Sequence, residues 1–322
     1  RVAFSPDGFL WSVQHNNEPI LQVENGDDSW HAGYDPIRRR YFLIGKLHRP
    51  FTWTNAEGRT LTQRIRLYYT SFSRDFKTWT PLKPVFAPDD KDPGVTQWYG
   101  ATGFQVRGDL SVGFLQVLRD DLSAEGAPPE AVACNYGNPG AGIGYTVLTW
   151  THDGETWHRD RHTDPFLLPD PRPGLWDHAM AWVSSAVPVG DEVYIYYAGY
   201  RWGHKYRRSV DRQVGLVRTV CDRYVAREAG PVMGRLVTYP LRLDADHLLL
   251  NANAAGGEVR VQVSDTSGRP IPGLTLTDCE PISADALSAP VRWKGSLASV
   301  RGKPVRLEFA ITNGALYAFE LR

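Results

Sequence analysis

Two pairs of neighbouring acid and imidazole side chains are the residues of this chain best suited to catalysis. Asp28 precedes His31 by three positions, and Asp177 is followed directly by His178. Each pair leads into a predicted strand, where such polar groups are costly unless they are hydrogen-bonded or functional. A carboxylate and an imidazole held together can accept and donate protons. We therefore predict Asp28, Asp177 and His178 as catalytic residues and His31 as a substrate-binding residue.

A third segment combines an amide with aromatic rings. In Gln97-Trp98-Tyr99, strand alternation places Gln97 and Tyr99 on one face. The amide can hydrogen-bond a sugar hydroxyl while Trp98 or Tyr99 stacks on the ring, and packing in a core is the alternative. Trp176 is a further substrate-binding candidate because it precedes Asp177. The charged candidates, for which a solvated strand end is the alternative, are Lys46, Arg119, Asp120 and Arg201. The basic aromatic loop 200–208 is either the wall of a sugar subsite or a solvated hairpin end.

The elements that position these residues are predicted from an internal repeat. Three segments, 5–11, 73–79 and 151–157, read Ser/Thr-x-Asp-Gly/Phe-x-x-Trp, and their first residues lie 68 and 78 positions apart. Asp-Gly is typical of a tight turn in which the Asp side chain caps its own backbone. Each turn follows a predicted strand, and each complete unit contains a second hairpin. Two hairpins in a repeat of this length predict a four-stranded propeller blade.

The repeat predicts an all-β chain with two domains. A β-propeller is expected over 1–229, with half a blade at 1–24 and full blades at about 25–93, 94–170 and 171–229. Short alternating strands predict an antiparallel β-sandwich over 230–322. Known propellers have about four to eight blades, so we expect upstream sequence to complete the ring, with completion by another chain as the alternative. The first strand of each blade lines the central channel, which would bring the candidate residues together.

The amino-acid composition argues against several classes of partner and ligand. Lys plus Arg and Asp plus Glu each number 36, and this balance argues against nucleic acid or a membrane surface as a partner. No apolar run is long enough to span a membrane. The three cysteines have no zinc-ligand spacing. The localisation stays open, and a periplasmic or secreted protein is compatible with the sequence.

The chain resembles bacterial proteins of the five-bladed β-propeller glycosidase superfamily, the glycoside hydrolase family 32/43-like type, across nearly its whole length. The resemblance is to a group with a C-terminal sandwich, and it implies an N-terminal portion that this sequence does not include. Fructosidase motifs of the Arg-Asp-Pro and Glu-Cys type are missing, which argues against fructan specificity. The motifs that carry the resemblance are Gly26-Asp27-Asp28, Tyr34-Asp35-Pro36, Gln97-Trp98-Tyr99-Gly100, Trp176-Asp177, Val189-Gly190-Asp191-Glu192, Leu249-Leu250-Asn251-Ala252-Asn253, Gly257-Glu258-Val259-Arg260-Val261, Asp278-Cys279-Glu280-Pro281, Val291-Arg292-Trp293 and Pro304-Val305-Arg306-Leu307.

Three functions follow as hypotheses. The first is a glycoside hydrolase that cleaves a poly- or oligosaccharide with carboxylate-assisted acid/base chemistry, since Asp28 and Asp177 lie on different predicted blades. The alternative is a non-catalytic carbohydrate-binding module, which the scarcity of Glu near the inner strands keeps open. The third is a docking scaffold. No cofactor is required; a calcium ion is allowed by the oxygen ligands available, although no motif requires one.

Overall fold

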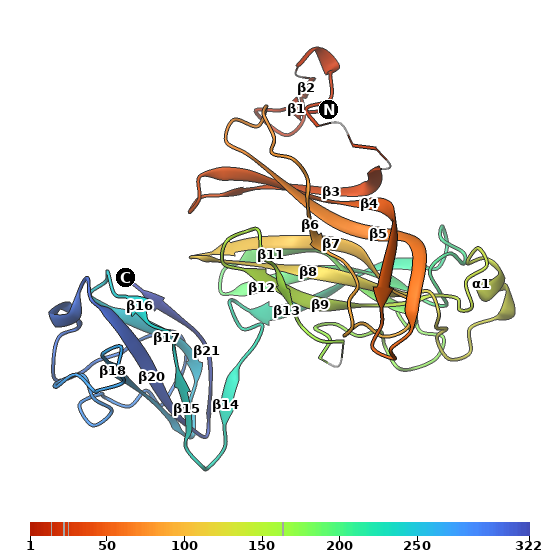
Figure 1. Ribbon diagram of the computed structural model, residues 1–322. Helices are drawn as coiled ribbons and strands as arrows, with labels where there is room; N and C mark the ends of the chain where they lie inside the picture. Colours follow the sequence, from red (N-terminus) through yellow and green to blue (C-terminus); the bar gives the residue numbers. More distant parts are fainter. Residues whose placement is uncertain (14, 22, 25, 163) are drawn as a thin grey trace. The chain divides into compact units, whose positions relative to one another are not determined.

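The computed structural model describes residues 1–13, 15–21, 23–24, 26–162 and 164–322 (Figure 1). Nearly all regular structure in these residues is β-strand, which confirms the predicted all-β fold class. The short helical segments are α1 (Pro129–Ala133) and two 3₁₀ turns at His15–Asn17 and Leu297–Val300. The chain divides into two compact units. Unit 1 comprises 1–187 and 194–217, and unit 2 comprises 188–193 and 218–322.

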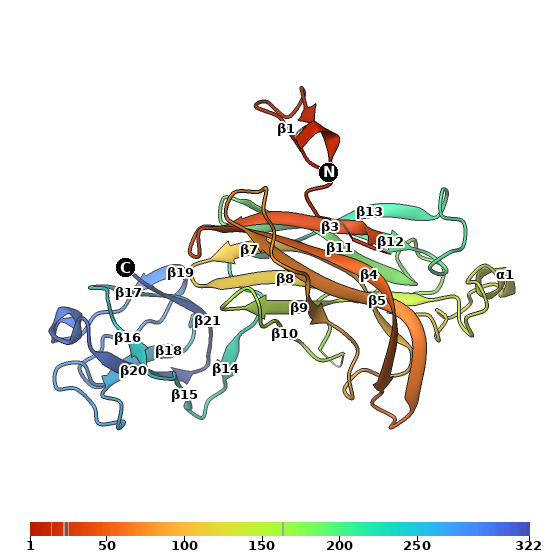
Figure 2. The same cartoon turned by 45° about the horizontal axis from the view of Figure 1, so that its top comes forward.

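The first large sheet of unit 1 is a four-stranded antiparallel meander, as expected of a propeller blade. Its order follows the chain, and Figures 1 and 2 show its long strands side by side. A Cβ on Gly45 would lie 2.2 Å from the Trp30 ring, so this position needs a glycine for the two strands to pack. The strands are β3 (Gly26–Asp35), β4 (Arg40–Thr54), β5 (Thr60–Ser73) and β6 (Lys83–Phe86).

Two further antiparallel meanders follow in the chain. They are joined into one seven-stranded sheet by a parallel bridge between Met180 and Gly144. The short hairpin of β1 (Ala3–Phe4) and β2 (Ser12–Val13) precedes them all. The strands of the seven-stranded sheet are β7 (Thr96–Arg107), β8 (Leu110–Arg119), β9 (Ile143–Thr151), β10 (His158–Arg159), β11 (Met180–Val189), β12 (Glu192–Tyr200) and β13 (Arg212–Val220).

The repeated turns have the predicted local chemistry. In each of the three copies the Ser or Thr hydroxyl donates to the Asp carboxylate at 3.0 Å. The same carboxylate oxygen accepts the backbone N–H groups two and three residues further on, at 2.6–2.9 Å. These backbone hydrogen bonds from Thr78 and Lys77 hold the pKa of Asp75 well below its usual value. The turns are therefore structural elements that close the outer hairpins.

Unit 2 contains two four-stranded sheets with a shared core. One has the order β14-β21-β17-β19, and in the other β15, β16 and β18 all pair with β20. Leu250 of the first sheet and Val261 and Phe309 of the second are completely buried in one cluster, as in a β-sandwich. The strands are β14 (Arg227–Ala229), β15 (Gly234–Val237), β16 (Leu241–Arg242), β17 (Leu248–Asn253), β18 (Glu258–Ser264), β19 (Asp285–Pro290), β20 (Pro304–Thr312) and β21 (Gly314–Leu321).

Candidate functional site

Tyr99, on β7, is the point where side chains from three predicted blades converge. Its ring stacks on Trp182 of β11 with 4.4 Å between centroids, and His204 meets it edge-on at 4.8 Å. From the first sheet, Lys46 Nζ lies 4.2 Å and Arg66 Cζ 4.8 Å from the ring centroid. Such cation–π contacts strengthen when the groups are withdrawn from water. Tyr99 itself is half-buried, so part of this aromatic centre remains accessible.

Lys46 and Asp28 form an ion pair beside Tyr99 in which the lysine is buried and the aspartate is exposed. The Lys46 side chain is only 2% exposed, whereas that of Asp28 is 80% exposed, and Nζ lies 2.9 Å from Asp28 Oδ1. The ammonium also donates to the backbone carbonyl of Tyr99 at 3.3 Å. A buried ammonium is stable only when it is paired in this way. The buried cation thus fixes a solvent-facing carboxylate at the start of β3.

A polar network continues from Arg66 into the interior. Arg66 donates to Gln97 Oε1 at 2.7 Å, and Gln97 Nε2 donates to Asp120 at 2.9 Å. Asn135 donates to the second oxygen of Asp120 at 2.9 Å. Burial raises the pKa of Asp120, but its interactions with His204 and Asn135 outweigh this and leave the pKa lowered. Asp120 is therefore an anchored anion that orients Gln97 toward Arg66.

His204 is the most deeply buried titratable group of this network. It is 1% exposed, and its Nδ1 lies 3.7 Å from Asp120 Oδ1, beyond a good hydrogen bond. Burial lowers the pKa of His204 to about 4, although Asp120 opposes the shift. The imidazole is consequently neutral at pH 7 and acts as an aromatic wall for Tyr99 and Trp182.

The second predicted catalytic carboxylate, Asp177, precedes β11. Its Oδ2 accepts a hydrogen bond from the Tyr197 hydroxyl at 2.8 Å. Trp176 stacks on Tyr197 with 5.4 Å between ring centroids. Burial and the bond to Asp177 both raise the pKa of Tyr197, so the phenol remains a donor. Asp177 is thus oriented by its own blade, and its catalytic role remains a prediction.

His178 occupies a different environment from its neighbour. It is buried, and its Nδ1 lies 2.7 Å from the carbonyl oxygen of Asp170. Its Nε2 lies 3.0 Å from the carbonyl oxygen of Glu125. Both ring nitrogens lie within hydrogen-bond distance of backbone carbonyl oxygens, and this places His178 between the long loop before β9 and the segment before β11. These contacts favour a structural role for His178, while its catalytic role stays untested.

The other predicted residues are spread over unit 1. His31, on β3, is half-buried with a burial-lowered pKa and packs edge-on against Phe104. Arg119 is held by two hydrogen bonds to Asp121, at 2.9 and 2.7 Å. Arg201 lies half-buried directly after β12. The structure therefore brings together Asp28, Lys46, Gln97 and Tyr99 among the predicted residues.

Trp98 faces the opposite side of β7 from Tyr99 and is completely buried. His162 stacks on its ring, and the Arg159 guanidinium lies 4.6 Å from its centroid. This environment fits the core-packing alternative for Trp98. The alternation of β7 therefore separates the two aromatic rings, one toward the candidate site and one toward the interior.

A cluster of buried titratable groups lies next to Trp98. Asp92, fully buried, makes a bidentate pair with Arg159 at 2.9 Å and contacts His162 Nε2 at 2.5 Å. His162 Nδ1 is 2.5 Å from the Tyr145 hydroxyl. Burial raises the pKa of Tyr145 to about 12, so this phenol is not a base near neutral pH. We interpret the cluster as a structural support for β7.

Sequence reasoning missed two members of the Tyr99 site, Arg66 and Trp182, which lie within strands and carry no motif. Asp120 was one of its charged candidates, and His204 belongs to the basic aromatic loop 200–208. No group of three or more His, Cys, Asp or Glu residues that could hold a metal occurs among the described residues. Within the same residues, no helix is long and apolar enough to cross a membrane.

No family model and no curated protein sequence matches this chain. Similar solved structures include a protein described as a glycoside hydrolase, with 16% identity and a TM-score of 0.40, covering 65% of this chain and 52% of that one. This chain thus spans about half the length of that protein. A family 32 β-fructofuranosidase of Bombyx mori has 10% identity and a TM-score of 0.37, covering 99% and 72% of the two chains. A family 43 arabinoxylan arabinofuranohydrolase from Bacillus subtilis has 10% identity and a TM-score of 0.35, covering 98% and 72%. These similarities concern the fold and establish no activity for this chain.

Proposed function

We propose that this protein is a glycoside hydrolase that binds a poly- or oligosaccharide around Tyr99. The observation that carries the proposal is the exposed Asp28 carboxylate held at 2.9 Å by the buried Lys46 ammonium. A carboxylate that faces solvent, yet is fixed in place, suits attack on a sugar or activation of water. Trp182 stacks on the half-buried Tyr99 ring and Lys46 lies over it, so Tyr99 would contact the sugar through the atoms that remain accessible.

In the proposed mechanism, Asp28 is the nucleophile or the base that activates water. Asp177, on the third full predicted blade, is the second carboxyl group, which protonates the leaving oxygen. Tyr197 orients Asp177 through its 2.8 Å hydrogen bond. Lys46 positions Asp28, and Arg66 with Gln97 contributes hydrogen-bond donors for sugar hydroxyls. A separation of about 5 Å between the carboxyl groups would correspond to retention, and roughly 6.5–9.5 Å to inversion.

A non-catalytic carbohydrate-binding module is the second candidate. The observation that favours it is that two carboxylates of unit 1 already have internal partners. Asp120 is buried among Gln97 and Asn135, and Asp177 accepts the Tyr197 hydroxyl. A binding site needs only the aromatic centre and the polar side chains around it, with no acid and base pair.

The experiment that separates the two is a turnover and binding screen with the full chain. Neutral and acidic oligosaccharides are incubated with the wild-type protein and with D28N and D177N, and D90N, an exposed loop substitution, is the matched control. The hydrolase predicts product release that falls by about 100-fold or more in D28N and D177N, with binding retained. Binding without product release from any oligosaccharide would instead favour the binding module. Unchanged turnover in D28N would refute the role given to this residue.

A further inference from the structure

A hollow lies at the end of β3 that is opposite to Asp28. Strand β3 extends from Gly26 to Asp35, so its two ends are separated by roughly 30 Å. The turn that follows β3 and the turn that follows β5 enclose an open hollow of about 660 Å³. This volume is within the range of small-molecule pockets. The hollow is therefore spatially distinct from the Tyr99 site.

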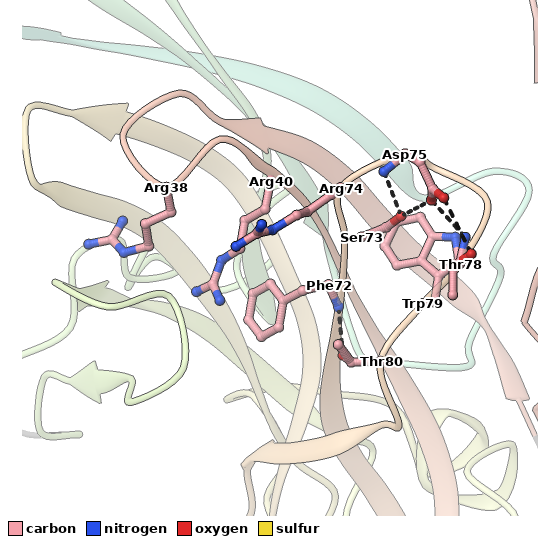
Figure 3. Close-up of a pocket in the computed structure, with 9 residues that line it drawn as sticks. All are labelled: Arg38, Arg40, Phe72, Ser73, Arg74, Asp75, Thr78, Trp79 and Thr80. Atoms are coloured by element: carbon pink, nitrogen blue, oxygen red, sulfur yellow. Dashed lines mark hydrogen bonds between the residues drawn. The ribbon is translucent and has the colours of Figure 1, made fainter.

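Three arginines line this hollow, Arg38, Arg40 and Arg74 (Figure 3). The Arg40 guanidinium lies 3.7 Å from the Phe72 ring centroid and is held by Glu155 at 3.2 Å. Arg38 is paired through Nη1 with Asp35 at 2.7 Å. An Arg guanidinium has five N–H donors, so one carboxylate leaves donors for a ligand.

Arg74 is the cation least committed to the fold. It is exposed in the turn after β5, and among the described residues no ion pair occupies its guanidinium. The carboxylate that lines the hollow, Asp75, is already engaged. It accepts hydrogen bonds from the hydroxyl groups of Ser73 and Thr78 and from backbone N–H groups of its own turn. The hollow thus has an excess of guanidinium groups over available carboxylates.

The remaining lining includes aromatic side chains. Trp79 and Phe72 lie on the same hollow as the arginines, as Figure 3 shows. Guanidinium groups recognise planar oxyanions through paired hydrogen bonds, and aromatic rings stack on the apolar faces of sugars. A sugar that carries a carboxylate combines both features in one residue. An inorganic anion would use only the arginines.

We propose that this arginine hollow is a second carbohydrate-binding site, specific for a saccharide unit that carries a carboxylate. Arg38 and Arg74 bind the carboxylate, Arg40 positions the Phe72 face, and Trp79 contacts the sugar ring. The site does not depend on hydrolysis at Asp28, because no residue is shared between the two sites. Its occupation would tether an acidic polysaccharide to the protein away from the Tyr99 site.

The test is titration calorimetry of the full chain with three probes: a trisaccharide of hexuronic acids, its methyl-esterified form, and sodium sulfate. The expected result is binding of the acid form, with the ester much weaker because it lacks the charge. R38Q/R74Q should weaken binding of the acid form by about tenfold or more. R74Q alone, which alters only an exposed side chain, should weaken it several-fold if the double variant does not fold.

Two controls make the result specific. R292Q removes an exposed arginine of unit 2 and should leave the affinity unchanged. D28N should also leave it unchanged, and this separates failure of the second site from failure of the proposed hydrolase. Equal affinity for the acid and the ester, or undiminished affinity in both R74Q and R38Q/R74Q, would overturn the proposal. Sulfate binding as tightly as the trisaccharide would overturn the saccharide assignment and reduce the hollow to a simple anion site.

Discussion

Replacing Asp92 by Asn should destabilise unit 1 strongly. Asp92 is fully buried and neutralises Arg159, whose side chain is 15% exposed. Removing one partner of a buried ion pair costs about 3–5 kcal/mol. The lower end applies here, about 3 kcal/mol, because Arg159 keeps a second carboxylate, Asp89, at 2.9 Å. The Asn side chain still accepts a hydrogen bond from His162, but it leaves Arg159 without its buried counter-charge.

The assay is guanidinium denaturation followed by tryptophan fluorescence, which reports on unit 1 because every tryptophan except Trp293 lies there. With an m-value of about 4 kcal/mol/M, a loss of about 3 kcal/mol moves the midpoint down by about 0.7 M. D89N is the matched control. It removes the partner of Arg159 that is 50% exposed and should cost only about 0.5 kcal/mol. A D92N loss no larger than that of D89N would refute the reasoning.

Three further predictions follow from the site. Burial lowers the pKa of His204 to about 4, so as the pH falls the unfolded chain is protonated at this residue before the folded chain. The free energy of unfolding of unit 1 should therefore fall by up to about 3 kcal/mol between about pH 6.5 and pH 4. H204N should flatten this part of the stability–pH curve, and an unchanged slope would contradict the lowered pKa. G45A should destabilise unit 1 by about 1–3 kcal/mol, since the added Cβ would lie 2.2 Å from the Trp30 ring. G26A should be tolerated, because the atom nearest to its added Cβ is 3.7 Å away. Thermal melts in which G26A is less stable than G45A would count against this packing. K46M should lower sugar binding or turnover at the Tyr99 site by about tenfold, because Asp28 loses the ammonium that positions it. R292Q is the control, and full activity in K46M would exclude a role for Lys46 in the site.

The sequence was a good guide wherever the interactions are local. The Ser/Thr-x-Asp turns depend on side chains within a few residues of one another, and their hydrogen bonds follow the prediction in all three copies. Strand alternation likewise separated Trp98 from Gln97 and Tyr99 correctly. The all-β fold class follows from the same short-range patterns.

The rest of the site depends on residues distant in the chain. Asp92 and His162 lie 70 positions apart, and each belongs to a connection between strands. Lys46 and Arg66 meet Tyr99 only because the first sheet packs beside the second. No periodicity in a single sequence encodes which loop covers which strand. The pairing of Asp28 with a buried lysine was therefore beyond sequence reasoning, although both residues were candidates.

The self-capped turns have a consequence for the order of folding. Each turn obtains its hydrogen bonds from its own Ser or Thr and Asp side chains, so it can form before any distant strand arrives. Local contacts of this kind form early, because little chain entropy is lost in making them. A turn that is set first fixes the register of its hairpin, and a slip of one residue would reverse the two faces of the strand. Turns that form first would therefore limit mispairing between strands that are distant in the sequence.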